Sequence, residues 1–311
     1  MKRLIIWLVT TFMVTYSAAA YAQSHDDGVL RILAIGNSFS DDGMEYIPAL
    51  LENLDVKNVE VARLFVGGCS LKQHFNFHQN SESPYIFTQS KRGENRWIEH
   101  KNKFSLSDAL KLGEWDIITL QQQSGNSGIY SSYEPYLGEL IKIIRRAQPN
   151  ARIAWHMTWS YSTNSTHGEF VKYDKDSRKM LATIMDASQA AAQAHPEIEI
   201  IIPAGTTIQL LRQSAINNHP QDLTRDGYHM GYGAGRYALA CTWYEELIAP
   251  YTKRSMLGNT LRINKGMVAV TPATAAYCQK AAQRAVRHNF SVKKIKGTKR
   301  TLRKIESNNK Q

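Results

Sequence analysis

Cysteine is scarce in this sequence, and its scarcity excludes one class of fold. Three cysteines occur among 311 residues, at Cys69, Cys241 and Cys278. They are too few and too widely spaced to staple a small disulfide-rich protein together. Cys241 and Cys278 could form one disulfide, but we expect two separate buried thiols.

Long apolar runs are also missing, apart from one at the N-terminus. Lys2 and Arg3 precede an apolar stretch over residues 4–14, and small residues follow it up to Ala22. This order predicts a secretory signal peptide over residues 1–22, cleaved near Ala22. A permanent anchor is the alternative, but the apolar stretch is short for a membrane span. We therefore expect an exported protein, periplasmic or secreted, without stable membrane insertion.

The sequence contains no recognised nucleic-acid-binding motif, although it is basic. Its formal net charge of +11 falls to +9 once Lys2 and Arg3 are removed with the signal peptide. Much of the excess lies in a tail over residues 291–311, which we interpret as a solvated terminus. Attraction of this tail to an acidic polymer or a membrane surface is the alternative. Because no motif accompanies the charge, we expect no nucleic-acid partner.

No internal repeat or low-complexity linker divides residues 23–290, which are predicted to form a single domain. Apolar runs of strand length alternate there with helical patterns, as in a parallel sheet with helices on both faces. We therefore predict a three-layer α/β/α sandwich, flavodoxin-like, with a central parallel sheet of about five strands. Residues 79–104 break the alternation and are interpreted as an insertion that could form one wall of a cleft. The expected strands are 30–35, 59–66, 116–120, 151–157 and 197–202, and the expected helices are 133–147, 173–194, 233–248 and 273–288.

Two motifs carry residues that could take part in catalysis. Gly-Asn-Ser-Phe-Ser at residues 36–40 closes the first strand, so a turn there would expose the hydroxyl of Ser38. Asp-Gly-Tyr-His at residues 226–229 lets Asp226 hold the ring of His229 in one tautomer. Taken singly, such a serine is commonly a helix cap and such an aspartate a turn residue. Taken together, an alcohol, an imidazole and a carboxylate are the parts of an acyl-transfer site.

The two motifs resemble those of the SGNH (GDSL-type) hydrolases, which carry an N-terminal G-[DN]-S-x-[ST] block and a C-terminal D-x-x-H block. The similarity is strongest to a branch found in Bacteroidetes with GNSFS, GGCSL, LQxQS and DGYH blocks in that order, and it covers about residues 29–250. The resemblance implies the SGNH hydrolase fold and an esterase that needs no cofactor. It also implies that Ser38 is the nucleophile, His229 the base, and Asp226 the group that orients His229.

An oxyanion hole is the other requirement of this chemistry. The resemblance implies two backbone donors, the N–H groups of Ser38 and of Gly68, which follows the second strand. Most members take a third donor from the asparagine of a G-x-N-D block after the third strand, but this sequence has Leu-Gln-Gln-Gln-Ser-Gly-Asn at residues 120–126. Gln123 is the predicted substitute, and Asn126 is the alternative.

Three further residues are predicted to contact the substrate. Trp159 and Tyr130 follow the ends of strands, where ligands bind in open parallel sheets, and aromatic faces match the C–H face of a sugar ring. His74 follows Gly68 closely and is expected to line the same cleft. His74 and His78 are also spaced like metal ligands on a helix, but no third ligand accompanies them, so no metal is expected.

The sequence therefore predicts a serine esterase that removes an acyl group, most simply acetyl, from a carbohydrate. The carbohydrate is inferred from the aromatic residues and from the resemblance. A lipid-directed esterase or thioesterase with the same triad is one alternative. A catalytically inactive glycan-binding protein on the same scaffold is another. The sequence does not indicate an oligomeric state.

Overall fold

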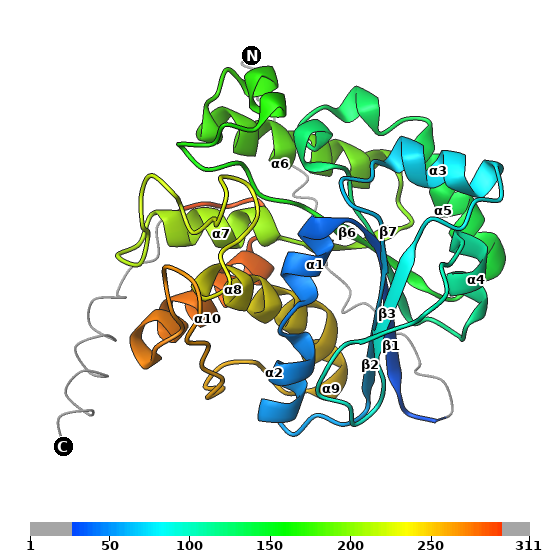
Figure 1. The fold of residues 1–311 in the computed structure, drawn as a ribbon, viewed down its shortest axis with the longest axis horizontal. Helices are drawn as coiled ribbons and strands as arrows, with labels where there is room; N and C mark the ends of the chain where they lie inside the picture. Colours follow the sequence, from blue (N-terminus) through cyan, green and yellow to red (C-terminus); the bar gives the residue numbers. More distant parts are fainter. Residues whose placement is uncertain (1–26, 294–311) are drawn as a thin grey trace, which may run out of the picture.

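A seven-stranded sheet forms the centre of the computed structural model, which describes residues 27–293 (Figure 1). Its strand order is β4-β3-β2-β1-β5-β6-β7. The five strands β2, β1, β5, β6 and β7 run parallel to one another, which confirms the predicted parallel sheet of about five strands. The predicted signal peptide and most of the predicted tail lie outside the described residues. The strands are β1 (Leu30–Gly36), β2 (Val59–Phe65), β3 (Ile86–Ser90), β4 (Ile98–Glu99), β5 (Ile117–Leu120), β6 (Arg152–His156) and β7 (Ile198–Ile202).

Helices cover both faces of the sheet, which confirms the three-layer α/β/α architecture. In Figure 1, α3, α4 and α5 lie on one face, and α1, α2, α7, α8 and α10 lie on the other. No helix within residues 27–293 is both long and apolar enough to cross a membrane. The helices are α1 (Ser38–Met44), α2 (Ile47–Asn53), α3 (Leu71–Gln79), α4 (Leu106–Lys111), α5 (Tyr136–Ala147), α6 (Ser177–Ala194), α7 (Ala204–Arg212), α8 (Ala234–Trp243), α9 (Ala249–Thr252) and α10 (Pro272–Arg287).

Helix α5 shows why the apolar pattern was informative. Leu137, Leu140, Ile141 and Ile144 are buried, and this spacing places all four on one side of the helix. The same periodicity predicted the other long helices within a few residues of their ends.

Helix α6 begins later than predicted because of a cap. The side chain of Asp176 accepts hydrogen bonds from the backbone N–H groups of Arg178 and Lys179, so the helix starts at Ser177. Such a carboxylate satisfies N–H groups that have no partner inside the helix.

The segment over residues 79–104 extends the sheet. Strand β3 pairs antiparallel with β2, and β4 pairs antiparallel with β3. Phe87 of β3 lies opposite Leu64 and is fully buried, so this addition contributes to the core. The insertion therefore lies along one edge of the sheet.

The three cysteines are free and buried in the structure. Burial raises the pKa of the Cys241 thiol to about 12, so this group stays protonated and unreactive at neutral pH. The expectation of separate buried thiols at Cys241 and Cys278 agrees with this arrangement.

Candidate active site

Asn37 joins the ends of three neighbouring strands. It follows β1, and its side-chain oxygen accepts hydrogen bonds from the backbone N–H of Phe39 at 3.0 Å and from Gln121, after β5, at 2.6 Å. Its amide nitrogen donates to the carbonyl oxygen of Cys69, after β2, at 2.9 Å. As the N-cap of α1, Asn37 makes Ser38 the first residue of that helix. The carboxyl ends of β1, β2 and β5 are thus held together around the serine.

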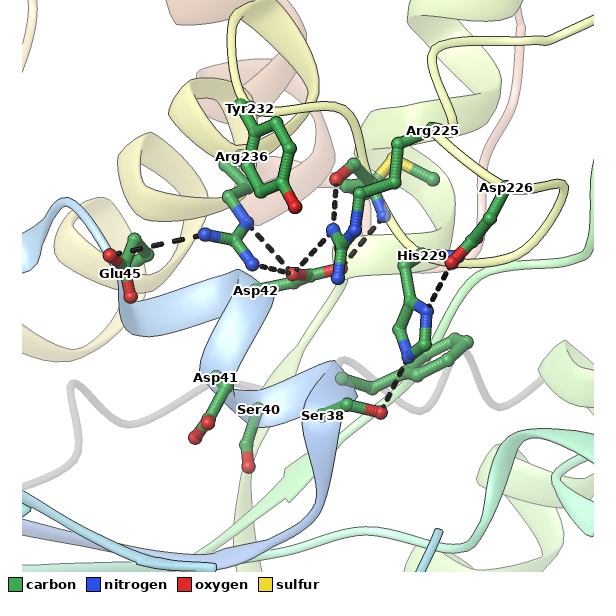
Figure 2. A network of polar contacts seen from close by, with 12 residues as sticks. Ser38, Ser40, Asp41, Asp42, Glu45, Arg225, Asp226, His229, Tyr232 and Arg236 are labelled. Atoms are coloured by element: carbon green, nitrogen blue, oxygen red, sulfur yellow. Dashed lines mark hydrogen bonds and ion pairs between the residues drawn. The ribbon is translucent and has the colours of Figure 1, made fainter. Parts of the chain in front are cut away.

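Ser38, His229 and Asp226 form a continuous hydrogen-bonded row (Figure 2). Nε2 of His229 lies 2.8 Å from Oγ of Ser38, and Nδ1 of His229 lies 2.7 Å from Oδ2 of Asp226. The other oxygen of Asp226 accepts the backbone N–H groups of Tyr228 at 3.2 Å and of His229 at 2.8 Å. The structure therefore brings together the three residues that the two motifs singled out.

The charge of Asp226 suits it to orient a base. Partial burial opposes ionisation, but hydrogen bonds from the side chain and backbone of His229 outweigh it and hold the pKa of Asp226 below its usual value. The carboxylate is therefore ionised at neutral pH and accepts the Nδ1 proton of His229. This leaves Nε2 of His229 as an acceptor for the proton of Ser38.

A cavity of about 320 Å³ opens beside Ser38. Its walls come from the residues after β1, β2 and β5, from His167, and from the loop that carries His229. No residue of the segment 79–104 lines this cavity, so the predicted role of that segment as a cleft wall was wrong. Its strand β3 pairs with the far side of β2, so β2 separates this segment from β1.

All three predicted oxyanion donors, Ser38, Gly68 and Gln123, border this cavity. Gly68 lies at φ +63°, a conformation that other residues rarely adopt, and a Cβ atom there would meet nothing within 4 Å. Gln123 also lines the cavity, and its side-chain oxygen accepts the backbone N–H of Asn126 at 3.1 Å. Among the described residues, the amide nitrogen of Gln123 has no hydrogen-bond partner, so it is available to an oxyanion. Asn126 does not line the cavity, and its side-chain oxygen accepts Lys172 at 2.9 Å. The geometry favours Gln123.

Trp159 does not contact the cavity, which corrects the prediction of a substrate contact. Its side chain is fully buried, and its ring stacks on Phe39 with 4.2 Å between centroids. Its indole N–H donates to the carbonyl oxygen of Tyr228 at 2.7 Å. The chain turns back into the core after β6, so Trp159 packs behind Phe39 and Tyr228, which line the cavity.

His74 was also wrongly predicted to line the cleft. It is 1% exposed, and Nδ1 lies 2.9 Å from the hydroxyl of Tyr85, on which the ring stacks. Burial lowers the pKa of His74 to about 3, so the ring is neutral. Tyr130 is half-buried beside Glu134 and does not line the cavity either. Among residues 27–293, no three His, Cys, Asp or Glu side chains are grouped as a metal site would require.

His167 and Tyr228 are cavity residues that the sequence did not reveal. Nδ1 of His167 accepts the backbone N–H of Glu169 at 3.2 Å, which leaves the ring proton on Nε2. The ring packs edge-on against Tyr228 with 4.6 Å between centroids, and burial lowers the pKa of His167. His167 is therefore a neutral hydrogen-bond donor at the cavity. Its position in a polar loop between β6 and α6 gave no signal, whereas Tyr228 lies inside the Asp-Gly-Tyr-His motif.

The α/β/α fold and the meeting of the two motifs confirm the resemblance to SGNH (GDSL-type) hydrolases. A family model described as "Domain of unknown function (DUF4886)" matches residues 31–278. The crystal structure of a DUF4886 family protein from Bacteroides uniformis is similar, with 34% identity, a TM-score of 0.78, and coverage of 86% of this chain and 98% of that one. An acetylxylan esterase from Geobacillus stearothermophilus matches at 12% identity and a TM-score of 0.48, over 74% of this chain and 97% of that one. Comparison with curated proteins found no match.

Proposed function

The chain belongs to the DUF4886 family, and from the geometry of its own site we propose that it is a serine esterase acting through an acyl-Ser38 intermediate. The observation that carries the proposal is the row from Ser38 through His229 to Asp226, with contacts of 2.8 and 2.7 Å. A serine hydroxyl needs such a base before it can attack a carbonyl carbon.

In the first half-reaction, Oγ of Ser38 attacks the ester carbonyl carbon while Nε2 of His229 takes the hydroxyl proton. The negative oxygen of the tetrahedral intermediate accepts the backbone N–H groups of Ser38 and Gly68 and the side-chain amide of Gln123. Collapse of the intermediate breaks the bond to the alcohol oxygen, which receives the proton from His229. The alcohol leaves, and the acyl group stays on Ser38.

In the second half-reaction, a water molecule attacks the acyl carbon and gives a proton to Nε2 of His229. The bond between the acyl carbon and Oγ of Ser38 then breaks, and the proton returns to Oγ. The products are a carboxylic acid and the free enzyme. Throughout, the charge of Asp226 stabilises the transient imidazolium, and the predicted donors stabilise the oxyanion by about 3–4 kcal/mol each.

A short acyl group is the acyl part that we propose. The cavity measures about 320 Å³, and no Leu, Ile, Val or Met side chain is among the residues that line it. A long acyl chain needs an extended apolar channel, whereas an acetyl group needs only a small space beside the nucleophile. These features support deacetylation over lipid hydrolysis.

A carbohydrate is the alcohol part that we propose. His167 offers an N–H donor and Tyr228 an aromatic ring at the cavity, and these groups suit the hydroxyls and the C–H face of a sugar. The predicted signal peptide would bring the enzyme to such a substrate in the periplasm or the medium. No cofactor takes part in the proposed reaction.

A series of p-nitrophenyl esters tests the proposal. We expect acetate to be hydrolysed with the highest kcat/KM and activity to fall steeply for butyrate and octanoate. Ser38→Ala should abolish both hydrolysis and labelling by a fluorophosphonate probe while the protein remains folded. A preference for octanoate would favour the lipid-directed alternative. Failure of the unmodified protein to react with the probe would favour an inactive binding protein.

Acetylated polysaccharides then test the alcohol. Release of acetate from a polymer at a kcat/KM above that for p-nitrophenyl acetate would support the carbohydrate. If no acetylated polysaccharide from plant or host sources is deacetylated, the carbohydrate part is wrong and the esterase part stands.

A further inference from the structure

Asp42 is a fully buried carboxylate on α1, one helical turn after Ser38. Its oxygens accept hydrogen bonds from Nη1 of Arg225 at 3.0 Å, from Nε of Arg236 at 2.8 Å, and from the backbone N–H of Met230 at 2.7 Å (Figure 2). A buried charge is tolerated only where such partners compensate it. The role of this cluster is not explained by the proposed chemistry, because Asp42 is not among the residues that line the cavity.

Two of these partners, Arg225 and Met230, flank the segment that carries Asp226 and His229. Arg225 immediately precedes Asp226, and Met230 immediately follows His229. The segment over residues 225–230 is also closed on itself, because the backbone N–H of Arg225 donates to the carbonyl oxygen of His229 at 2.9 Å. Nη1 of Arg225 donates to the carbonyl oxygen of Met230 at 2.5 Å. Asp42 therefore accepts hydrogen bonds from both ends of this loop, from Arg225 and from Met230.

Arg236 holds the same carboxylate from a different element. It lies on α8, and besides Asp42 it reaches Glu45 of the chain after α1 at 3.9 Å. The ring of Tyr232 lies over both guanidinium groups, 5.0 Å from that of Arg225 and 4.8 Å from that of Arg236. Arg236 thus neutralises Asp42 and joins α8 to α1, whereas Arg225 joins the loop to α1.

We propose that Asp42 is a positioning residue that fixes the loop of His229 at reacting distance from Ser38. Ser38 and Asp42 belong to one short rigid helix, so a loop anchored on Asp42 is placed relative to Ser38. The inference rests on the proposed esterase function. A displacement of about 1 Å between reacting groups costs about a hundredfold in rate, so such an anchor has a measurable effect on turnover.

Arg225→Met and Arg236→Met form a matched pair for the test. Each removes one guanidinium group from the same carboxylate and leaves the other in place, so the fold keeps a counter-charge for Asp42. We expect Arg225→Met to lower kcat for p-nitrophenyl acetate about ten- to a hundredfold with KM changed less than about twofold. We expect Arg236→Met to lower Tm with kcat changed less than about twofold. Arg225→Lys, which restores a donor, should recover most of the lost kcat.

Asp42→Asn supplies a second variant if Arg225→Met does not fold. It should also lower kcat with little change in KM at a temperature well below its Tm, and it should slow fluorophosphonate labelling of Ser38 by a similar factor. Equal kcat in both arginine variants, or full kcat in Asp42→Asn, would reduce the cluster to a stabilising role and overturn the proposal.

Comparison with Ser38→Ala separates the two proposals. If the unmodified protein neither hydrolyses esters nor reacts with the probe, the esterase function fails and the positioning role fails with it. If the unmodified protein is active, Ser38→Ala is inactive and Arg225→Met is unimpaired, only the role of Asp42 is overturned.

Discussion

His229 and Ser38 are 191 positions apart in the chain, yet Nε2 of one lies 2.8 Å from Oγ of the other. The sheet brings Ser38 to the end of β1, and the loop of residues 225–230 reaches it from the start of α8. Their contact is therefore a property of the tertiary structure.

Gln123→Ala is expected to lower kcat about a hundred- to a thousandfold because it removes one donor to the oxyanion. KM for p-nitrophenyl acetate should change little, whereas the Tm should fall modestly, because the variant also loses the hydrogen bond from the backbone N–H of Asn126 to the side-chain oxygen of Gln123. Steady-state kinetics and thermal unfolding measure these effects. Asn126→Ala is the matched control, and a larger loss of kcat in that variant would assign the donor to Asn126.

His167→Phe is expected to raise KM for an acetylated oligosaccharide about five- to tenfold, because one hydrogen bond to the substrate is lost. Phenylalanine keeps an aromatic ring against Tyr228, so kcat for p-nitrophenyl acetate should stay within about twofold. Parallel kinetics on the two substrates measure the difference. An equal effect on the two substrates would show that His167 supports the triad and does not bind the sugar.

Trp159→Ala is expected to lower the free energy of unfolding by about 3–5 kcal/mol, because it leaves a cavity under Phe39. Urea unfolding measures the change, and Trp159→Phe, which keeps a stacked ring, should lose much less. A stable Trp159→Ala protein with a raised KM would restore the original prediction of a substrate contact.

Glu246 should make the folded state less stable as pH rises. Its Oε2 atom is buried and has no hydrogen-bond partner in the described part of the chain, and burial raises its pKa from 4.5 to about 8. The folded protein therefore holds a proton that the unfolded chain releases above about pH 4.5, and stability falls between pH 4.5 and 8.

Glu246→Gln should flatten this dependence, because glutamine does not ionise. Between pH 5 and pH 9, the unmodified protein should lose a few kcal/mol more unfolding free energy than the variant does. Guanidinium unfolding at the two pH values measures the difference. Parallel pH curves for the two proteins would show that Glu246 is charged in the folded state.

The positions of the parallel strands and of the triad residues after their carboxyl ends could be predicted, because both follow from local sequence patterns. Apolar runs of strand length located the parallel strands of the core, and the motifs around Ser38 and His229 located the triad. Trp159 and His74 could not be placed, because whether a residue beyond a strand end faces solvent or core depends on the tertiary path of the chain. His167 and the partners of Asp42 were missed for the same reason.

The segment over residues 79–104 was misjudged because short antiparallel strands carry little periodicity. Its β3 strand has one buried aromatic residue, Phe87, and its β4 strand is two residues long and exposed. A pattern of that length predicts no strand by itself, and the pairing with β2 becomes evident only in the fold.

The brevity of β4 has a consequence for how these molecules meet one another. An uncovered border strand normally presents a row of free backbone N–H and C=O groups on which another polypeptide can add, a common start of aggregation. With two residues in β4, a neighbouring molecule finds almost no backbone to extend on that side. This margin of the sheet is therefore protected against growth into larger assemblies.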